Sequence, residues 1–102
     1  MYGVITRVPA PVETYDGMHA EMTRRTETSV DGLLVHVGRP TAEGFELLEV
    51  WESKEHYDRA NTDIVLPLMR ELTRDQPAPQ IEPATEVFAV HGLVIPPANV
   101  LI

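Results

Sequence analysis

The chain has 102 residues, of which 43% are hydrophobic and 24% charged, and its formal net charge is -8. These values predict one globular domain, and the acidic balance disfavours nucleic acid as a partner because phosphate backbones would be repelled. The chain has no cysteine, which excludes disulfides and thiolate chemistry. It has neither a membrane-spanning apolar run nor a basic-then-apolar leader, so we expect a cytoplasmic protein that binds no membrane.

The first half of the chain predicts a strand, a helix and two further strands. Residues 1–8 form a short β-branched run bounded by prolines, which is typical of a strand. Apolar and aromatic residues then recur at helical spacing over 12–26. Two apolar segments, 32–37 and 45–51, predict strands on either side of a turn that contains proline and glycine.

The second half predicts a helical region, a loop and a fourth strand. Ser53 can cap a helix, and apolar residues continue at helical spacing after it. Pro67 interrupts this pattern, because a proline removes a backbone hydrogen bond and clashes with the preceding turn. We therefore expect one short helix over 53–61 and another over 62–75, followed by a proline-rich loop and a strand over 85–94.

The order β-α-β-β-α-β is that of a ferredoxin-like α+β domain with a four-stranded antiparallel sheet. We predict a single domain over 1–102 whose second helical region is broken near Pro67. One face of such a sheet carries the helices, so an apolar opposite face needs a second layer. Residues 94–102 form an apolar C-terminal arm without charged side chains, and a partner subunit is its simplest cover. A tail that folds back on its own domain or is partly disordered is the alternative.

A polar cluster is predicted inside the sheet. Matching the apolar faces of the second and third strands places His36, Leu34, Leu47, Glu49 and Trp51 together on the other side. His36 and Glu49 would then form a cross-strand pair, and the carboxylate would make the imidazole an oriented general base. The alternative is a core histidine that is merely satisfied by a hydrogen-bond partner.

Trp51 and three further side chains are candidates for the same pocket or for plain packing. Trp51 and Tyr57 are either core aromatics or pocket walls. His19 lies on the apolar stripe of the first helix and is expected to face the sheet, whereas His91 in the fourth strand is a pocket wall or an interface residue. The histidines lack metal-binding spacing, and no phosphate-binding loop or serine-hydrolase motif is present. We therefore expect no metal and no cofactor.

The segment LLEVWESKEHYDRANTDIVLPLMREL, with the length and the element order, resembles the dimeric α/β-barrel superfamily, in particular its antibiotic-biosynthesis-monooxygenase-like group. The similarity covers most of the chain. Its most specific part is the strand ending in VWES, followed by a helix with an aromatic residue four positions after the serine. The resemblance implies a homodimer whose two sheets meet in a barrel, with a ligand pocket between each sheet and its helices.

Functional residues of this group are only partly present. Quinone-forming relatives have a tryptophan and a tyrosine that match Trp51 and Tyr57, whereas Leu47 stands at their asparagine and Glu71 near their arginine. Haem-degrading relatives share only the tryptophan, so haem cleavage is disfavoured. The expected function is a cofactor-independent monooxygenase that acts on an aromatic or quinol-type compound, and the alternative is a non-catalytic dimeric binding or stress-related module with a vestigial pocket. The predicted catalytic residues are His36, Trp51 and Tyr57, and the predicted substrate-binding residues are His19, Glu49 and His91.

Overall fold

The predicted order of strands and helices is confirmed, and a short hairpin follows it. The computed structural model describes residues 1–27, 30–72, 74, 83–98 and 100–101. The elements are β1 (Tyr2–Val8), α1 (Val12–Thr26), β2 (Leu33–Pro40), β3 (Phe45–Trp51), α2 (Lys54–Ala60), a π-helical segment (Asn61–Val65), α3 (Leu66–Leu72), β4 (Ala84–Ala89), β5 (Val94–Ile95), a 3-10 turn (Pro96–Ala98) and β6 (Val100–Leu101).

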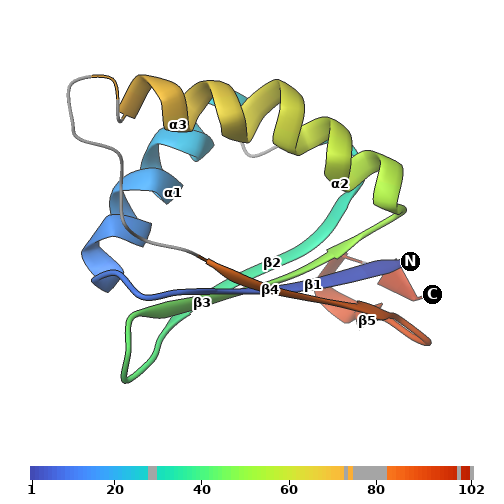
Figure 1. Ribbon diagram of the computed structural model, residues 1–102. Coiled ribbons are helices and arrows are strands. Elements are labelled where there is room, and N and C mark those ends of the chain that lie inside the picture. The colour runs from blue at the N-terminus through green and yellow to red at the C-terminus, as the bar shows by residue number, and fades with distance from the viewer. Residues whose placement is uncertain (28–29, 73, 75–82, 99, 102) are drawn as a thin grey trace.

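The four long strands form one antiparallel sheet in the order β2-β3-β1-β4. The helices α1, α2 and α3 lie on the same side of this sheet, and the described residues place no α-helix on the other side (Figure 1). This arrangement is the ferredoxin-like α+β fold that the sequence predicts. The small core under α2 is built on Val4, Trp51 and Ala60, which are at most 7% exposed.

A bulge in β2 changes one predicted position. The register between β2 and β3 shifts between Leu33 and Val35, and Leu33 lies opposite Trp51. Leu33, rather than the predicted Leu34, therefore packs against the core around Trp51. A bulge adds one residue to one strand, so the alternation that places the other side chains correctly fails at this end.

As the sequence predicts, the second helical region is divided near Pro67 into two α-helices, α2 and α3, and the π-helical segment Asn61–Val65 joins them without a gap. Ser53 caps α2 as predicted, because its hydroxyl accepts the backbone N–H of His56 at 3.3 Å. The widened π turn follows, and the N–H of Leu66 bonds the carbonyl of Asn61, five residues back. Such a turn relieves the clash that Pro67 would cause with a regular preceding turn. The backbone hydrogen-bond pattern therefore changes locally while the helical run continues. None of the described helices is long and apolar enough to cross a membrane.

The fourth strand is shorter than predicted. It ends at Ala89, so His91 lies beyond the sheet and is exposed, not within a strand. The following segment forms a separate two-stranded hairpin, in which Val94–Ile95 pairs with Val100–Leu101. Proline lacks a donor for a strand ladder, and the prolines at 96 and 97 form the turn of this hairpin. Residues 99 and 102 of the predicted arm lie outside the described residues.

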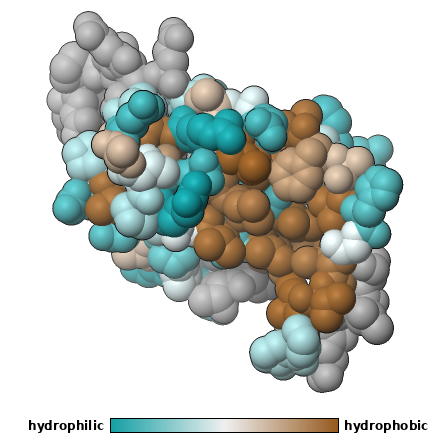
Figure 2. Space-filling view, turned by 90° about the horizontal axis from the view of Figure 1, so that it is seen from below, coloured by the Kyte–Doolittle hydropathy of each residue, from teal (hydrophilic) through white to brown (hydrophobic). Residues whose placement is uncertain are grey.

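The sheet face that carries no helix is apolar over a wide area (Figure 2). Val37 is 51% exposed, and its neighbours across the strands are also aliphatic. The aromatic ring of Phe88 lies over Gly3 on the same face, where a side chain at position 3 would collide with it. By register, the face includes Ile5, Val35, Val37, Leu48, Val50 and Phe88.

Candidate functional site

The predicted pair of titratable side chains is present between β2 and β3. His36 lies directly opposite Glu49 in the antiparallel register. The imidazole Nδ1 is 2.7 Å from the carboxylate Oε2. The two side chains are 24% and 18% exposed, so solvent or a small ligand can reach a pair that is otherwise enclosed by the helices.

The carboxylate of Glu49 is held from a second side by the indole of Trp51. Residues two apart on a strand share a face, and the Trp51 Nε1–H donates to Glu49 Oε1 at 3.4 Å. Trp51 is only 5% exposed, so it is also a core residue. Trp51 is therefore a core aromatic residue and a site residue at the same time.

The first helix extends the site with two rings that reach the same histidine. The hydroxyl of Tyr15 lies 3.0 Å from Nε2 of His36 and 3.3 Å from Nδ1 of His19. Tyr15 and His19 are four residues apart and so share one helix face. The His19 and His36 rings are nearly parallel, at 12°, with their centroids 5.6 Å apart. His19 faces the sheet site, as the sequence predicts.

These contacts form a chain of hydrogen bonds with one consistent direction. An ionised carboxylate only accepts, so Nδ1 of His36 carries the hydrogen that Glu49 binds. Nε2 of His36 then holds a lone pair, which accepts the hydroxyl of Tyr15, and the Tyr15 oxygen accepts Nδ1–H of His19. This direction holds for the neutral imidazole of His36, and the tautomers of both histidines are assigned from the network. We call His19, Tyr15, His36 and Glu49 the hydrogen-bond chain.

Tyr15 keeps its proton in this environment. Burial raises the pKa of the Tyr15 phenol above its ordinary value of 10.0, and the negative charges of Asp16 and Glu49 raise it further. Burial acts in this direction because it disfavours the charged phenolate. At neutral pH the hydroxyl therefore remains a donor to His36.

Gly38 makes room for the tyrosine. A Cβ at this position would lie 2.4 Å from Cζ of Tyr15 and 2.6 Å from its hydroxyl oxygen. Gly38 is two residues after His36 on the same face of β2, so a side chain there would push the phenol away from the imidazole. The close approach of α1 to the strand depends on this glycine.

Two of the predicted site residues lie outside the hydrogen-bond chain. The ring of Tyr57 packs edge-on against Trp51, at a centroid distance of 5.8 Å, and in a tilted arrangement against Tyr2, at 5.6 Å. His91 is exposed beyond the end of β4, outside the hydrogen-bond chain. Conversely, Tyr15 is a site residue that the helical spacing over 12–26 did not single out. Its spacing of four from His19 is the signal that indicates a shared site.

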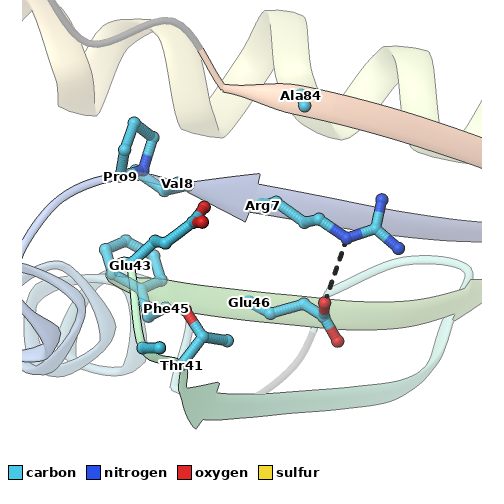
Figure 3. A pocket seen from close by; sticks show the side chains of 9 residues that line it. Arg7, Val8, Pro9, Thr41, Glu43, Phe45, Glu46 and Ala84 are labelled. Atoms are coloured by element: carbon cyan, nitrogen blue, oxygen red, sulfur yellow. Dashed lines mark hydrogen bonds and ion pairs between the residues drawn. The ribbon is translucent and has the colours of Figure 1, made fainter.

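A cavity of about 440 Å³ lies at the end of the sheet, near the turn between β2 and β3 (Figure 3). Arg7 and Glu46 point toward each other beside it, with Nε and Oε2 3.2 Å apart (Figure 3). Phe45 lines the cavity and also packs against Tyr15, with ring centroids 5.6 Å apart. The buried side chain of Phe45 therefore contacts both the cavity and the hydrogen-bond chain. No sequence pattern predicts this cavity.

The described residues contain no group of three His, Asp or Glu side chains arranged to hold a metal ion. The polar chemistry of the site thus consists of one carboxylate, two imidazoles, one phenol and one indole. Such a set can orient a hydroxyl-bearing ligand and move its proton.

Comparison with known proteins places the fold but not the reaction. No family model and no curated protein sequence matches the chain. A monooxygenase from Streptomyces coelicolor, solved with the ligand nanaomycin D, is 19% identical, with a TM-score of 0.59 over 93% of this chain and 90% of that one. SnoaB, a cofactor-independent oxygenase from Streptomyces nogalater, is 13% identical, with a TM-score of 0.62 over 93% and 96%.

A third similar structure is the heme-degrader MhuD from Mycobacterium tuberculosis, at 17% identity and a TM-score of 0.56 over 93% of this chain and 99% of that one. Identities this low establish a shared architecture and leave the chemistry of the site to be argued from its own residues. The predicted resemblance is therefore confirmed at the level of fold: the chain has the ferredoxin-like fold of antibiotic biosynthesis monooxygenases.

Proposed function

We propose that the chain is a homodimeric, cofactor-independent monooxygenase that acts on an aromatic or quinol-type compound. The observation that carries this proposal is the part-exposed His36, whose Nδ1 is held by Glu49 at 2.7 Å. An imidazole oriented by a carboxylate is a suitable base, because the carboxylate stabilises the imidazolium that forms. The similar structures of a monooxygenase with nanaomycin D and of a cofactor-independent oxygenase support the same class of substrate.

The reaction follows from the removal of one proton. His36 is the final acceptor of the proton from a ring hydroxyl of the substrate, and Glu49 pairs with the resulting imidazolium. The electron-rich substrate anion gives one electron to O₂, and the substrate radical and superoxide then combine in a C–O bond. The resulting peroxide anion takes a proton back from the His36 imidazolium. Water then leaves, made from the terminal O–H of the hydroperoxide and the hydrogen of the same ring carbon, and the C=O of the quinone remains. The indole of Trp51 keeps the second carboxylate oxygen of Glu49 in place during the proton transfer.

The proposed homodimer accounts for the apolar sheet face. Val37 and Val94 are large apolar side chains that are 51% and 59% exposed. Their exposure supports a second copy that covers the helix-free face and the C-terminal hairpin.

The alternative is a dimeric module that binds a ligand without changing it. Leu47 favours this alternative, because it puts an aliphatic side chain on the site face, opposite Gly38 and Thr6. The quinone-forming relatives to which the sequence is similar have an asparagine at this position. A site without that amide has one fewer polar group to hold an oxygenated substrate.

The single tryptophan provides the test. Trp51 fluorescence is titrated with quinols, aromatic polyketide-like acids, flavin and haem, and oxygen uptake is then measured with each compound that binds. A His36→Ala variant should bind more weakly and lose oxygen uptake while its circular dichroism stays native. Saturable binding without oxygen uptake, in every class of compound, would favour the non-catalytic module.

A further inference from the structure

We propose that Tyr15, on α1, is the group that takes the proton of the substrate, and that His36 and Glu49 act behind it. This inference rests on the proposed function, since it names the residue that meets the substrate hydroxyl in the same site. In this proposal the substrate hydroxyl contacts Tyr15 on α1 and not His36 on β2.

The argument starts from the ring nitrogens of His36. Nδ1 is 2.7 Å from the Glu49 carboxylate, and Nε2 is 3.0 Å from the Tyr15 hydroxyl. Both nitrogens are therefore engaged within the protein. A substrate that donated directly to His36 would have to break one of these hydrogen bonds first. A substrate that donates to the Tyr15 oxygen breaks neither, because a phenol oxygen accepts while its hydrogen donates.

The side of Tyr15 that faces away from His36 is the side of the hydrogen-bond chain that solvent can reach. Its other neighbour, His19, is exposed on α1, and the distance between His19 Nδ1 and the Tyr15 oxygen is 3.3 Å, the longest of the three contacts in the chain. The His19 ring is stacked on Tyr15 at 5.3 Å and 22°. We assign His19 as a positioning residue, which directs the phenol toward His36 and leaves the second lone pair of its oxygen for the ligand.

The transfer consists of two coupled proton movements. The substrate O–H bond breaks as a new O–H bond forms at the Tyr15 oxygen, and the original Tyr15 O–H bond breaks as Nε2–H forms on His36. The products are the substrate anion, a neutral Tyr15 and the His36 imidazolium paired with Glu49. No phenolate is formed at Tyr15, which agrees with the raised pKa of this phenol between Asp16 and Glu49. The reverse movement, from His36 through Tyr15, returns the proton to the peroxide that forms from the substrate anion and O₂.

The test uses a chromogenic phenol, 4-nitrophenol, whose anion absorbs visible light and whose neutral form does not. Binding to the wild-type protein should raise the ionised fraction severalfold above that of free 4-nitrophenol at the same pH. Tyr15→Phe keeps the ring and removes only the hydroxyl, so it should bind the probe with little added ionisation. Tyr2→Phe is the matched control, since Tyr2 lies on the same sheet face but belongs to the core around Trp51.

The opposite results are equally clear. Full ionisation in Tyr15→Phe would overturn the proposal and make His36 the direct acceptor. Failure of the wild type to bind or to ionise the probe would also overturn it. If Tyr15→Phe does not bind at all, ¹⁵N NMR of His36 in the wild type decides. The Nε2 resonance should move to the protonated position when the probe binds, and an unchanged resonance would reject the relay.

Oxygen uptake separates this inference from the proposed function. Ionisation of the probe without oxygen uptake from any quinol would reject the monooxygenase and leave the proton relay intact. Oxygen uptake that is unchanged in Tyr15→Phe would reject the relay and leave the monooxygenase intact.

Discussion

The side chains of the hydrogen-bond chain depend on one another, because each of their polar atoms serves as a donor or an acceptor for a neighbour. Glu49 accepts on both oxygens, from His36 and from Trp51. His36 uses both nitrogens, and Tyr15 uses its hydrogen and its oxygen. In a partly enclosed site, leaving a polar group without its hydrogen-bond partner costs more free energy than the hydrogen bond itself contributed to stability. Single substitutions at these residues should therefore have larger effects than those of ordinary surface positions.

The charge of Glu49 should be needed for the reaction. Glu49→Gln keeps the size of the side chain but leaves no negative charge to stabilise the His36 imidazolium. We expect oxygen uptake to fall by about 10²-fold or more, the usual contribution of an oriented acid or base. Glu52→Gln, an exposed change on the same stretch of chain, is the control. Equal rates in both variants would remove Glu49 from the mechanism.

The phenol of Tyr15 should titrate above its ordinary value. Burial, with Asp16 and Glu49, raises its pKa above 10.0, so the folded protein keeps the proton more tightly than the unfolded chain. This contribution to stability is fully present below pH 10 and is lost as the pH rises through the higher folded value. Ultraviolet titration of the three tyrosines should show one late phase that Tyr15→Phe removes. A late phase that survives in Tyr15→Phe would contradict the assignment.

Gly38 should be coupled to Tyr15. Because a Cβ would lie 2.4 Å from the phenol ring, Gly38→Ala should lower the free energy of unfolding by about 1–3 kcal/mol, as overpacking usually does. The cost should shrink when Tyr15→Ala is present, since the colliding ring is gone. Urea unfolding of the single and double variants measures this coupling. Additive costs would show that Gly38 is needed for another reason.

Among the elements, α1 carries two site residues with little packing of its own. None of its side chains is buried. An ion pair of Arg25 with Glu71, at 2.7 Å, links it to α3, and surface ion pairs contribute little to stability. The hydrogen bond from Tyr15 to His36 is a specific contact that places this helix on the sheet, together with the ring contacts of Tyr15 with Phe45 and of His19 with His36.

Gly17 provides a test of the exposed side of α1. The residue is exposed, and a Cβ there meets no other atom within 4 Å. Gly17→Ala should raise the free energy of unfolding by about 0.5–1 kcal/mol, because glycine loses more chain entropy in a helix. The urea midpoint measures this gain. A loss of stability instead would indicate that a partner packs closely against this part of the helix.

At the scale of the whole molecule, the two faces of the sheet differ in what covers them. The helices cover one face, and the apolar face opposite them is open (Figure 2). Val37→Glu puts a charge on the open face where the side chain is already 51% exposed, so the monomer fold should tolerate it. Analytical ultracentrifugation should give a dimer for the wild type and a monomer of 11.4 kDa for the variant.

Val87→Glu is the matched control for the dimer. Val87 is 53% exposed, but it lies beside Val4 on the helix side of the sheet. The control should remain dimeric. A wild type that sediments as a monomer, or a control that dissociates as Val37→Glu does, would contradict an interface through the open sheet face.

The sequence by itself determined what depends on local periodicity. Alternation along a strand was sufficient to pair His36 with Glu49 on one face, and helical spacing was sufficient to find α1 and the run around Pro67. These patterns repeat over two to four residues. The bulge that exchanges Leu34 for Leu33 breaks the pattern, and the prediction fails at that residue.

Only the tertiary structure decided which helix residue meets which strand residue. Tyr15 and His36 are 21 positions apart, and their contact depends on the angle at which α1 crosses the sheet and on the space left by Gly38. The end of β4 before His91 and the cavity beside Phe45 are likewise set by contacts between distant segments. Such contacts have no period along the chain, because they arise when the helix layer packs on the sheet.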